Sequence, residues 1–188
     1  MSRILIVDDE ESILKSLKRV LRLAPCTYGN KHYTLEISTF SSPHAALAAA
    51  HNEEFDLFMS DYRMPGMDGI EFLKAAKAIQ PDAARLILSG YADLNALVRA
   101  VNEVGIERFI GKPWNDYDLT SAIGQALAHR ELLLENRQLA NLVRVEMGDL
   151  TPEQLEAERL ERIEPGITTV NWGPDGSVIL DPEFQAKD

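Results

Sequence analysis

Four polar groups in the sequence each follow directly on an apolar run. Asp8 and Asp9 close the first run, Asp61 closes the third, Ser89 ends the fourth and Lys112 follows the fifth. Carboxylates crowded together repel one another unless a cation holds them, and hard oxygen ligands suit Mg²⁺. A Mg²⁺ held by two carboxylates neutralises charge on an incoming phosphoryl group, while the third carboxylate acts as nucleophile.

The hydroxyl and the amine fit the same chemistry. Ser89 can hydrogen-bond a phosphoryl oxygen on Asp61, and Lys112 offers a point charge for phosphate. Taken singly, Ser89 would be a turn residue, Lys112 a surface lysine, and each acid a helix cap or a solvated loop residue. Their occurrence at four strand ends favours a common site.

The runs that carry these groups are of strand length and mostly rich in branched or aromatic residues. The stretches between them space apolar residues by three and four, which predicts helices. Alternating strands and helices predict a parallel sheet with helices on both faces and functional groups at the carboxyl ends of the strands. The strands are Ile4–Val7, Leu35–Phe40, Phe55–Ser60, Arg85–Leu88 and Ile106–Ile110, and the helices are Glu10–Leu23, Pro43–His51, Ile70–Ile79 and Leu94–Val104.

A longer helical pattern follows these alternating segments. It starts near Asn115 and Asp116, continues without a breaker through Val143, and ends at Gly148. A helix of about 45 Å, at 1.5 Å per residue, is longer than one domain face covers. We therefore expect its far half to project and to meet a partner.

The remaining segment is short and acidic. Thr151-Pro152-Glu153-Gln154 predicts a helix start, and that helix should end at Glu164-Pro165-Gly166. Residues 167–172 and 177–180, on either side of Gly173-Pro174-Asp175-Gly176, predict a hairpin. We expect three regions: residues 1–128 as the main domain, 129–147 as the extended helix and 148–188 as the tail.

Charge and composition argue against proteins that bind DNA, bind or span membranes, or are secreted. The net charge is −11, and the residues from Glu146 onward account for −8 of it. Acidic charge without a basic patch disfavours binding to DNA or to an anionic membrane. No apolar run is long enough to span a bilayer, the apolar N-terminal stretch is too short for a signal peptide, and the single cysteine suits a reducing cytoplasm.

The four groups, taken in order and spacing, resemble a known signature. Asp8-Asp9, then Asp61-Tyr62-Arg63-Met64-Pro65-Gly66-Met67-Asp68-Gly69, then Ser89-Gly90, then Lys112-Pro113, is similar to the receiver domain of two-component response regulators. The similarity covers about residues 1–128. It implies a doubly wound, flavodoxin-like α/β fold with a five-stranded parallel sheet.

The resemblance also implies the site. Asp61 corresponds to the phosphoacceptor, Asp8 and Asp9 to the Mg²⁺-binding pair, and the backbone carbonyl of Arg63 to a further metal ligand. Lys112 corresponds to the lysine that contacts phosphate.

Two further positions correspond to the family's switch residues. Ser89 matches the hydroxyl switch residue, and Phe109 occupies the aromatic position where the family often has tyrosine. Phenylalanine has no hydroxyl, so any hydrogen bond made by such a tyrosine is absent here. The chain also departs from the family at residues 24–33, where the connection after the first helix is longer than the family needs. We expect a surface loop there, in which Cys26 and His32 form no metal site.

Two other readings of the acidic residues remain open at this point. A phosphohydrolase of the haloacid-dehalogenase kind also uses a carboxylate, a hydroxyl, a lysine and Mg²⁺ on a parallel sheet. Its nucleophile follows the first strand in an Asp-x-Asp-x-Thr/Ser pattern, which Asp8-Asp9-Glu10-Glu11-Ser12 does not fit. An unphosphorylated interaction module is disfavoured because every signature position is filled.

The expected output is a set of protein contacts. Residues 129–188 are too few and too acidic for a winged-helix DNA-binding domain and show no cyclase or phosphodiesterase motif. We expect a switch that is not itself an enzyme with a catalytic output domain. Its expected partners are a sensor histidine kinase or phosphotransfer protein, a downstream protein effector, and a second copy of the chain bound through the long helix.

Overall fold

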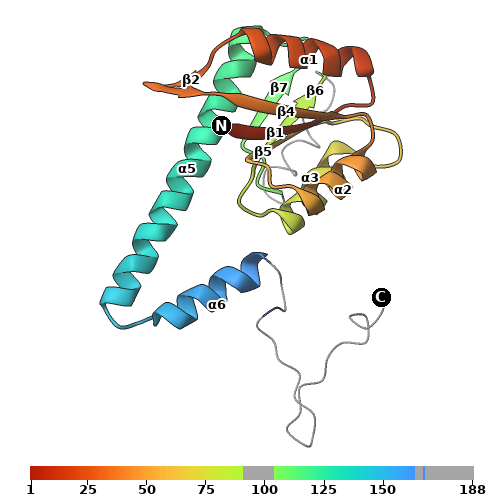
Figure 1. The fold of residues 1–188 in the computed structure, drawn as a ribbon. Helices are drawn as coiled ribbons and strands as arrows, with labels where there is room; N and C mark the ends of the chain where they lie inside the picture. Colours follow the sequence, from red (N-terminus) through yellow and green to blue (C-terminus); the bar gives the residue numbers. More distant parts are fainter. Residues whose placement is uncertain (91–103, 164–166, 168–188) are drawn as a thin grey trace, which may run out of the picture. The chain divides into compact units, whose positions relative to one another are not determined.

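A computed structural model of the chain describes residues 1–90, 104–163 and 167 (Figure 1). The chain divides into two compact units, Met1–Leu134 and Glu135–Asp188. The predicted boundaries at 128/129 and 147/148 stay predictions.

The first unit is built on a five-stranded parallel sheet in the order β4-β1-β5-β6-β7. The predicted doubly wound α/β fold is therefore confirmed. Register brings the carboxyl ends of neighbouring strands together, because Val7 pairs with Ser60 and Ser89 pairs with Gly111. The strands are β1 (Ser2–Val7), β4 (Leu35–Phe40), β5 (Leu57–Asp61), β6 (Ala84–Ser89) and β7 (Arg108–Gly111).

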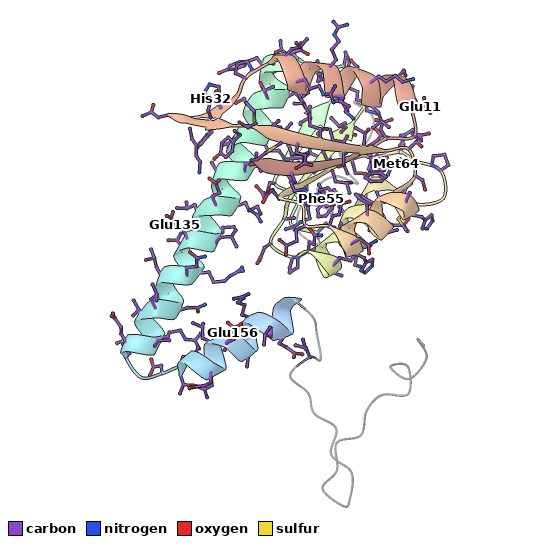
Figure 2. All side chains as sticks on the ribbon, in the orientation of Figure 1. Glu11, His32, Phe55, Met64, Glu135 and Glu156 are labelled. Atoms are coloured by element: carbon purple, nitrogen blue, oxygen red, sulfur yellow. The ribbon has the colours of Figure 1, made fainter. Side chains whose placement is uncertain are left out.

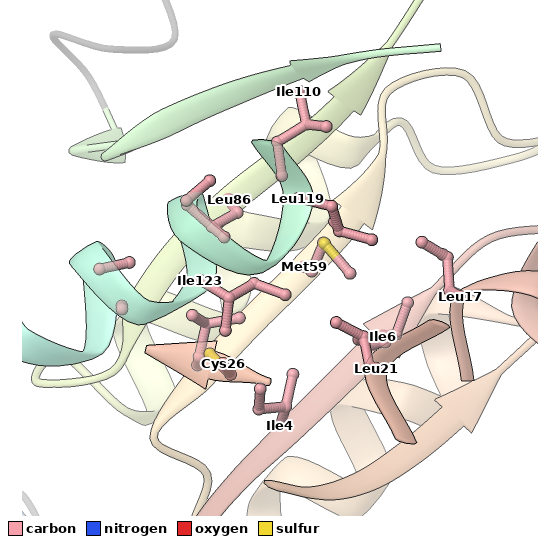
Figure 3. Packing of buried hydrophobic residues seen from close by; sticks show 14 of the residues in the cluster. Ile4, Ile6, Leu17, Leu21, Cys26, Met59, Leu86, Ile110, Leu119 and Ile123 are labelled. Carbon is pink, nitrogen blue, oxygen red and sulfur yellow. The ribbon is translucent and has the colours of Figure 1, made fainter. Parts of the chain in front are cut away.

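Successive side chains of a strand point to opposite faces, so the sheet has two cores. Ile4 and Ile6 pack in the core shared with helices α1 (Glu11–Leu23) and α5 (Asp116–Glu146), shown in Figure 3. Leu5 and Val7 pack in the other core, against helices α2 (Pro43–Asn52) and α3 (Gly69–Ile79). A sheet covered on both faces holds its strands rigidly and leaves only their ends open to chemistry.

The predicted elements are present within the described residues, with boundaries shifted by a few positions, as is common at element ends. The predicted helix 94–104 lies outside the described residues except for Val104. Only Ile167 of the predicted hairpin is described.

The expectation of a surface loop at residues 24–33 was wrong. Strands β2 (Cys26–Tyr28) and β3 (Lys31–Tyr33) form an antiparallel hairpin in which Cys26 pairs with Tyr33. Gly29, at φ 57°, supplies the positive φ that a tight hairpin turn needs. Both paired side chains are buried, Cys26 in the α1/α5 core, while His32 is exposed (Figure 2).

The second unit begins within the long helix. Helix α5 ends at Glu146, and Gly148 adopts φ 79° beyond it, as predicted. Helix α6 (Pro152–Ile163) starts as predicted, because the Thr151 hydroxyl accepts from the Gln154 amide and the Gln154 side chain accepts from the Thr151 amide. No helix within the described residues is both long and apolar enough to span a membrane.

Two leucines of α1 provide a matched test of this fold. Leu17 is fully buried, whereas Leu23 is 78% exposed. We expect Leu17→Ala to lower the free energy of unfolding by about 3 kcal/mol, because it leaves a cavity under the sheet. Leu23→Ala should change it by less than about 0.5 kcal/mol. Urea unfolding of both variants measures the difference, and similar losses would contradict the described packing of α1.

Candidate functional site

Three charged side chains from three strand ends meet at the carboxyl edge of the sheet. The Lys112 ammonium lies 2.7 Å from Asp8 Oδ2 and also forms an ion pair with Asp61 Oδ1. Asp8 has no exposed surface and the Asp61 side chain is only 9% exposed. The structure thus brings together three of the predicted site residues, Asp8, Asp61 and Lys112.

Backbone amides hold the two carboxylates in place. Asp61 Oδ2 accepts a hydrogen bond of 2.8 Å from the Arg63 amide, and Asp8 Oδ1 accepts one of 2.9 Å from the Glu10 amide. In each carboxylate, one oxygen thus accepts a hydrogen bond from a backbone amide and the other pairs with the Lys112 ammonium. Hydrogen bonds to charged groups are stronger than those between neutral groups, so both side chains are fixed in orientation.

Gly69 allows helix α3 to start against the backbone of Asp61. A Cβ at position 69 would lie 2.0 Å from the Asp61 carbonyl oxygen, so no side chain fits there. Asp68 caps the same helix, since its carboxylate accepts from the Ile70 and Glu71 amides. Gly69 was not predicted to have a role of its own, although a glycine directly after a helix cap is a signal for such a close approach.

Burial and the ion pair act in opposite directions on the charged groups. Burial raises the pKa of Asp61, and this outweighs the Lys112 ammonium and the Arg63 amide, which lower it; nearby Asp8 raises it further. Burial lowers the pKa of Lys112, but the hydrogen bonds and negative charges of Asp61 and Asp8 raise it more, so it lies above its ordinary value. The site therefore holds a firmly protonated lysine beside a carboxylate whose ionisation is costly.

The other predicted site residues lie around this centre. Ser89 is buried, and its hydroxyl donates to the Gly90 carbonyl oxygen at 3.0 Å. Phe109 is half-buried beside the α2/α3 core. Asp9 and the Arg63 side chain are exposed. The Lys112–Pro113 peptide bond is cis.

The carboxylates at this edge suit Mg²⁺ in kind and in number. Mg²⁺ usually takes one or two carboxylates, keeps several waters and completes its shell with other oxygens. Asp8 and Asp61 supply two hard oxygen donors at adjacent strand ends. Among the described residues, no group of three or more His, Cys, Asp or Glu side chains is arranged to hold a metal.

Comparison with known proteins agrees with this geometry. Residues 4–124 match the family model for the response regulator receiver domain. The chain belongs to the response regulator receiver family. The transcriptional regulatory protein FixJ of Bradyrhizobium diazoefficiens is 31% identical over 80% of this chain and 69% of its own length.

Other relatives extend far beyond the shared receiver. The hydrogenase transcriptional regulatory protein HoxA of Cupriavidus necator is 33% identical over 66% of this chain, and this chain spans about a quarter of its length. By contrast, one solved structure matches over nearly its whole length. The receiver domain from Clostridium thermocellum is 30% identical with a TM-score of 0.61, over 71% of this chain and 99% of its own. These similarities give no support to the haloacid-dehalogenase alternative.

The raised pKa of Asp61 makes the stability of the fold depend on pH. A carboxyl whose pKa is higher folded than unfolded stabilises the fold at low pH, and that contribution is lost as pH rises through its folded pKa. Asparagine cannot ionise, so Asp61→Asn should melt at a higher temperature than wild type near pH 7. The difference should shrink as pH falls toward 3.8, the ordinary pKa of aspartate.

Thermal melts in buffers free of divalent metal measure this dependence. Asp9→Asn is the matched control, because it removes an exposed carboxylate next to the same site and should change little. A melting temperature of Asp61→Asn below that of wild type at pH 7 would show that the ion pair with Lys112 outweighs the burial of the charge.

Proposed function

We propose that this chain is a phosphorylation-activated switch of two-component signalling, with Asp61 as the phosphoacceptor. The observation that carries the proposal is the Lys112 ammonium between two buried carboxylates at three strand ends. The phosphoryl donor in the cell would be the phosphohistidine of a sensor kinase or of a phosphotransfer protein. The absence of a membrane-spanning helix in the described residues is compatible with a cytoplasmic location.

The transfer itself is a simple exchange of bonds. A carboxylate oxygen of Asp61 attacks the phosphorus, the bond from phosphorus to the donor imidazole nitrogen breaks, and that nitrogen takes up a proton. Lys112 is placed to pair with a phosphoryl oxygen, because its ammonium already pairs with Asp61. The Arg63 amide keeps the carboxylate oriented throughout.

A metal site is part of this proposal. Asp8, Asp9 and Asp61, with the backbone carbonyl of Arg63, would hold Mg²⁺, and the ion supplies charge neutralisation when phosphate arrives. Among the described residues, Asp8 and Asp61 carry the geometric support, and Asp9 is the next carboxylate in the chain.

Ser89 and Phe109 are the proposed switch. The Ser89 hydroxyl is bonded to the neighbouring Gly90 carbonyl, so it can turn toward a phosphoryl oxygen by rotating one side-chain torsion. Phe109 lines a groove between β7 and α5, where repacking changes the surface offered to partners. Phosphorylation would act by shifting the population between two packings.

The proposed output is contact with proteins, including a second copy of the chain. Within the second unit, Leu139, Leu142 and Val143 of α5 are at least half exposed. Leu132, Asn136, Leu139 and Val143 follow one another at steps of four and three, as in a coiled-coil seam. DNA binding, which the names of FixJ and HoxA suggest, is not proposed for this acidic chain.

The phosphoacceptor is tested with acetyl phosphate. Wild type should gain one phosphoryl group per chain when Mg²⁺ is present, and Asp61→Asn should gain none because it lacks the nucleophile. Intact-protein mass spectrometry measures both, and Asp116→Asn, an exposed aspartate at the start of α5, is the control that should label normally.

The same assay separates the metal from the acceptor. Asp9→Ala should lower both Mg²⁺ affinity and the labelling rate by at least about tenfold, the usual scale for loss of a group that supports a metal. Undiminished Mg²⁺ affinity in Asp9→Ala would move the metal site elsewhere, and stoichiometric labelling of Asp61→Asn would refute the acceptor.

Self-association is tested by placing charges on the helix. Leu139→Asp combined with Leu142→Asp should weaken association of the phosphorylated chain by at least about tenfold, because one carboxylate replaces a seam leucine and the other replaces an exposed leucine beside the seam. Labelling of Asp61 should be unaffected. Gln138→Asp combined with Asn141→Asp adds the same charge to the outer side of α5 and should associate as wild type does, as measured by sedimentation velocity.

A further inference from the structure

The β2–β3 hairpin, which the family does not require, lies against helix α5. Cys26 Sγ lies 3.4 Å from the Thr120 carbonyl oxygen, a buried contact between residues far apart in the sequence. Figure 3 shows Cys26 beside Ile123 of the same helix. This contact ties the first strand of the hairpin to α5 within the α1/α5 core.

A second contact brings the two backbones together. A Cβ at Gly124 would lie 2.7 Å from the carbonyl oxygen of Thr27 and 3.0 Å from its carbonyl carbon. Glycine is a poor helix former, so its place in the middle of a helix needs a reason. The close approach of the hairpin supplies that reason.

The third contact is electrostatic and lies farther along the helix. Glu131 accepts from the Lys31 ammonium at 2.5 Å and from the Tyr33 hydroxyl at 3.1 Å. Leu127 is the last buried residue of α5, so Glu131 lies one turn beyond the end of the helix's core contacts. There the hairpin holds one side of α5, while Arg130 ties the helix to the segments just before β5 and β6, through an ion pair of 2.8 Å with Asp56 and a hydrogen bond of 2.9 Å to the Asp82 carbonyl oxygen.

We propose that the β2–β3 hairpin is a strap that fixes the position and rotation of α5 where this helix leaves the core. The strap thereby determines which side of α5 meets a second copy of the chain. The second of these statements, that the hairpin determines which side of α5 docks, is the docking half of the inference, and it rests on the dimer proposed above. The first, that the hairpin is a strap on α5, does not depend on the dimer.

The exposed side follows from the helical repeat. Thr120, Gly124 and Glu131 share the side that the hairpin holds. At 3.6 residues per turn, Gln125, His129 and Leu132 lie about a third of a turn away from it. Those three line one groove, with Tyr28 of the hairpin as another part of its wall.

The spacing of this side points to another α5 as its occupant. Gln125, His129 and Leu132 are separated by four and three residues, and the same steps lead on to Asn136, Leu139 and Val143. The apolar part of this seam runs from Leu132 through Leu139 to Val143, and Asn136 is a polar residue within it. Leucine and a β-branched residue at the two seam positions, with one asparagine, are features of parallel two-stranded coiled coils. A self-complementary seam of this kind fits a symmetric dimer.

The strap is tested by Gly124→Ala in the full chain. Alanine is the better helix former, so without the hairpin contact this change should raise the melting temperature by about 4 °C. With the strap it should lower the melting temperature, because the new Cβ collides with Thr27. In a matched chain whose residues 25–33 are replaced by a short loop, the same change should raise it. A rise in the full chain would overturn the strap.

A milder pair of variants tests the electrostatic contact without a steric clash. Burial and the bond to Glu131 raise the pKa of Tyr33 to about 12. In Glu131→Gln the absorbance titration of Tyr33, assigned by difference from Tyr33→Phe, should move toward lower pH. Tyr33→Phe with Glu131→Gln should also melt at a higher temperature than the sum of the single changes predicts. An unshifted titration with additive melting temperatures would overturn the contact at Glu131.

The docking half is tested by sedimentation of the phosphorylated chain. Gly124→Ala should raise the dimer Kd by about tenfold while Asp61 labels normally, because the helix would no longer present its seam in one rotation. Unchanged association would overturn the docking half. A wild-type chain that stays monomeric in both phosphorylation states would overturn the proposed dimer, and the melting temperatures would still decide the strap.

Discussion

The arrangement of this protein depends on one ammonium group held between two buried carboxylates. Lys112 pairs with both Asp8 and Asp61, each of which would be costly to bury unpaired. The three residues come from the ends of β7, β1 and β5, so the sheet must be parallel and in register for them to meet. The two cores that cover the sheet hold those ends in place.

The same site shows where chemistry and stability conflict. Burial raises the pKa of Asp61, so the negative charge that the proposed nucleophile needs also costs stability. Gly69 brings the start of α3 against the Asp61 backbone, a packing that no other residue type allows. A phosphoryl group or a metal ion would change the net charge around the Lys112 ammonium, and the ion pairs of this site would then rearrange. The hairpin on α5 then matters because it would hold rigid the helix that leaves the domain.

Much of this arrangement could be predicted from the sequence, because local residue types indicate the strand ends, the helix caps and the continuous helix α5. Asp8, Asp61 and Lys112 could be placed together since parallel strands end at one edge. The hairpin was missed because its cue is small: Gly29-Asn30 between two three-residue strands whose burial depends on α5. The roles of Gly69 and Gly124 depend on backbones brought together by tertiary packing, and the present bond of Ser89 to Gly90 is a choice of rotamer.

We propose that the Asp61 carboxylate beside Lys112, and no other group, carries the phosphoryl bond. Borohydride reduces an aspartyl phosphate to homoserine, so treatment of the chain after acetyl phosphate and Mg²⁺ marks the acceptor permanently. Peptide mass spectrometry should find homoserine at position 61 alone. Homoserine at position 8 or 9, or a phosphoryl group that resists reduction because it lies on a histidine or serine, would show that Asp61 is not the acceptor.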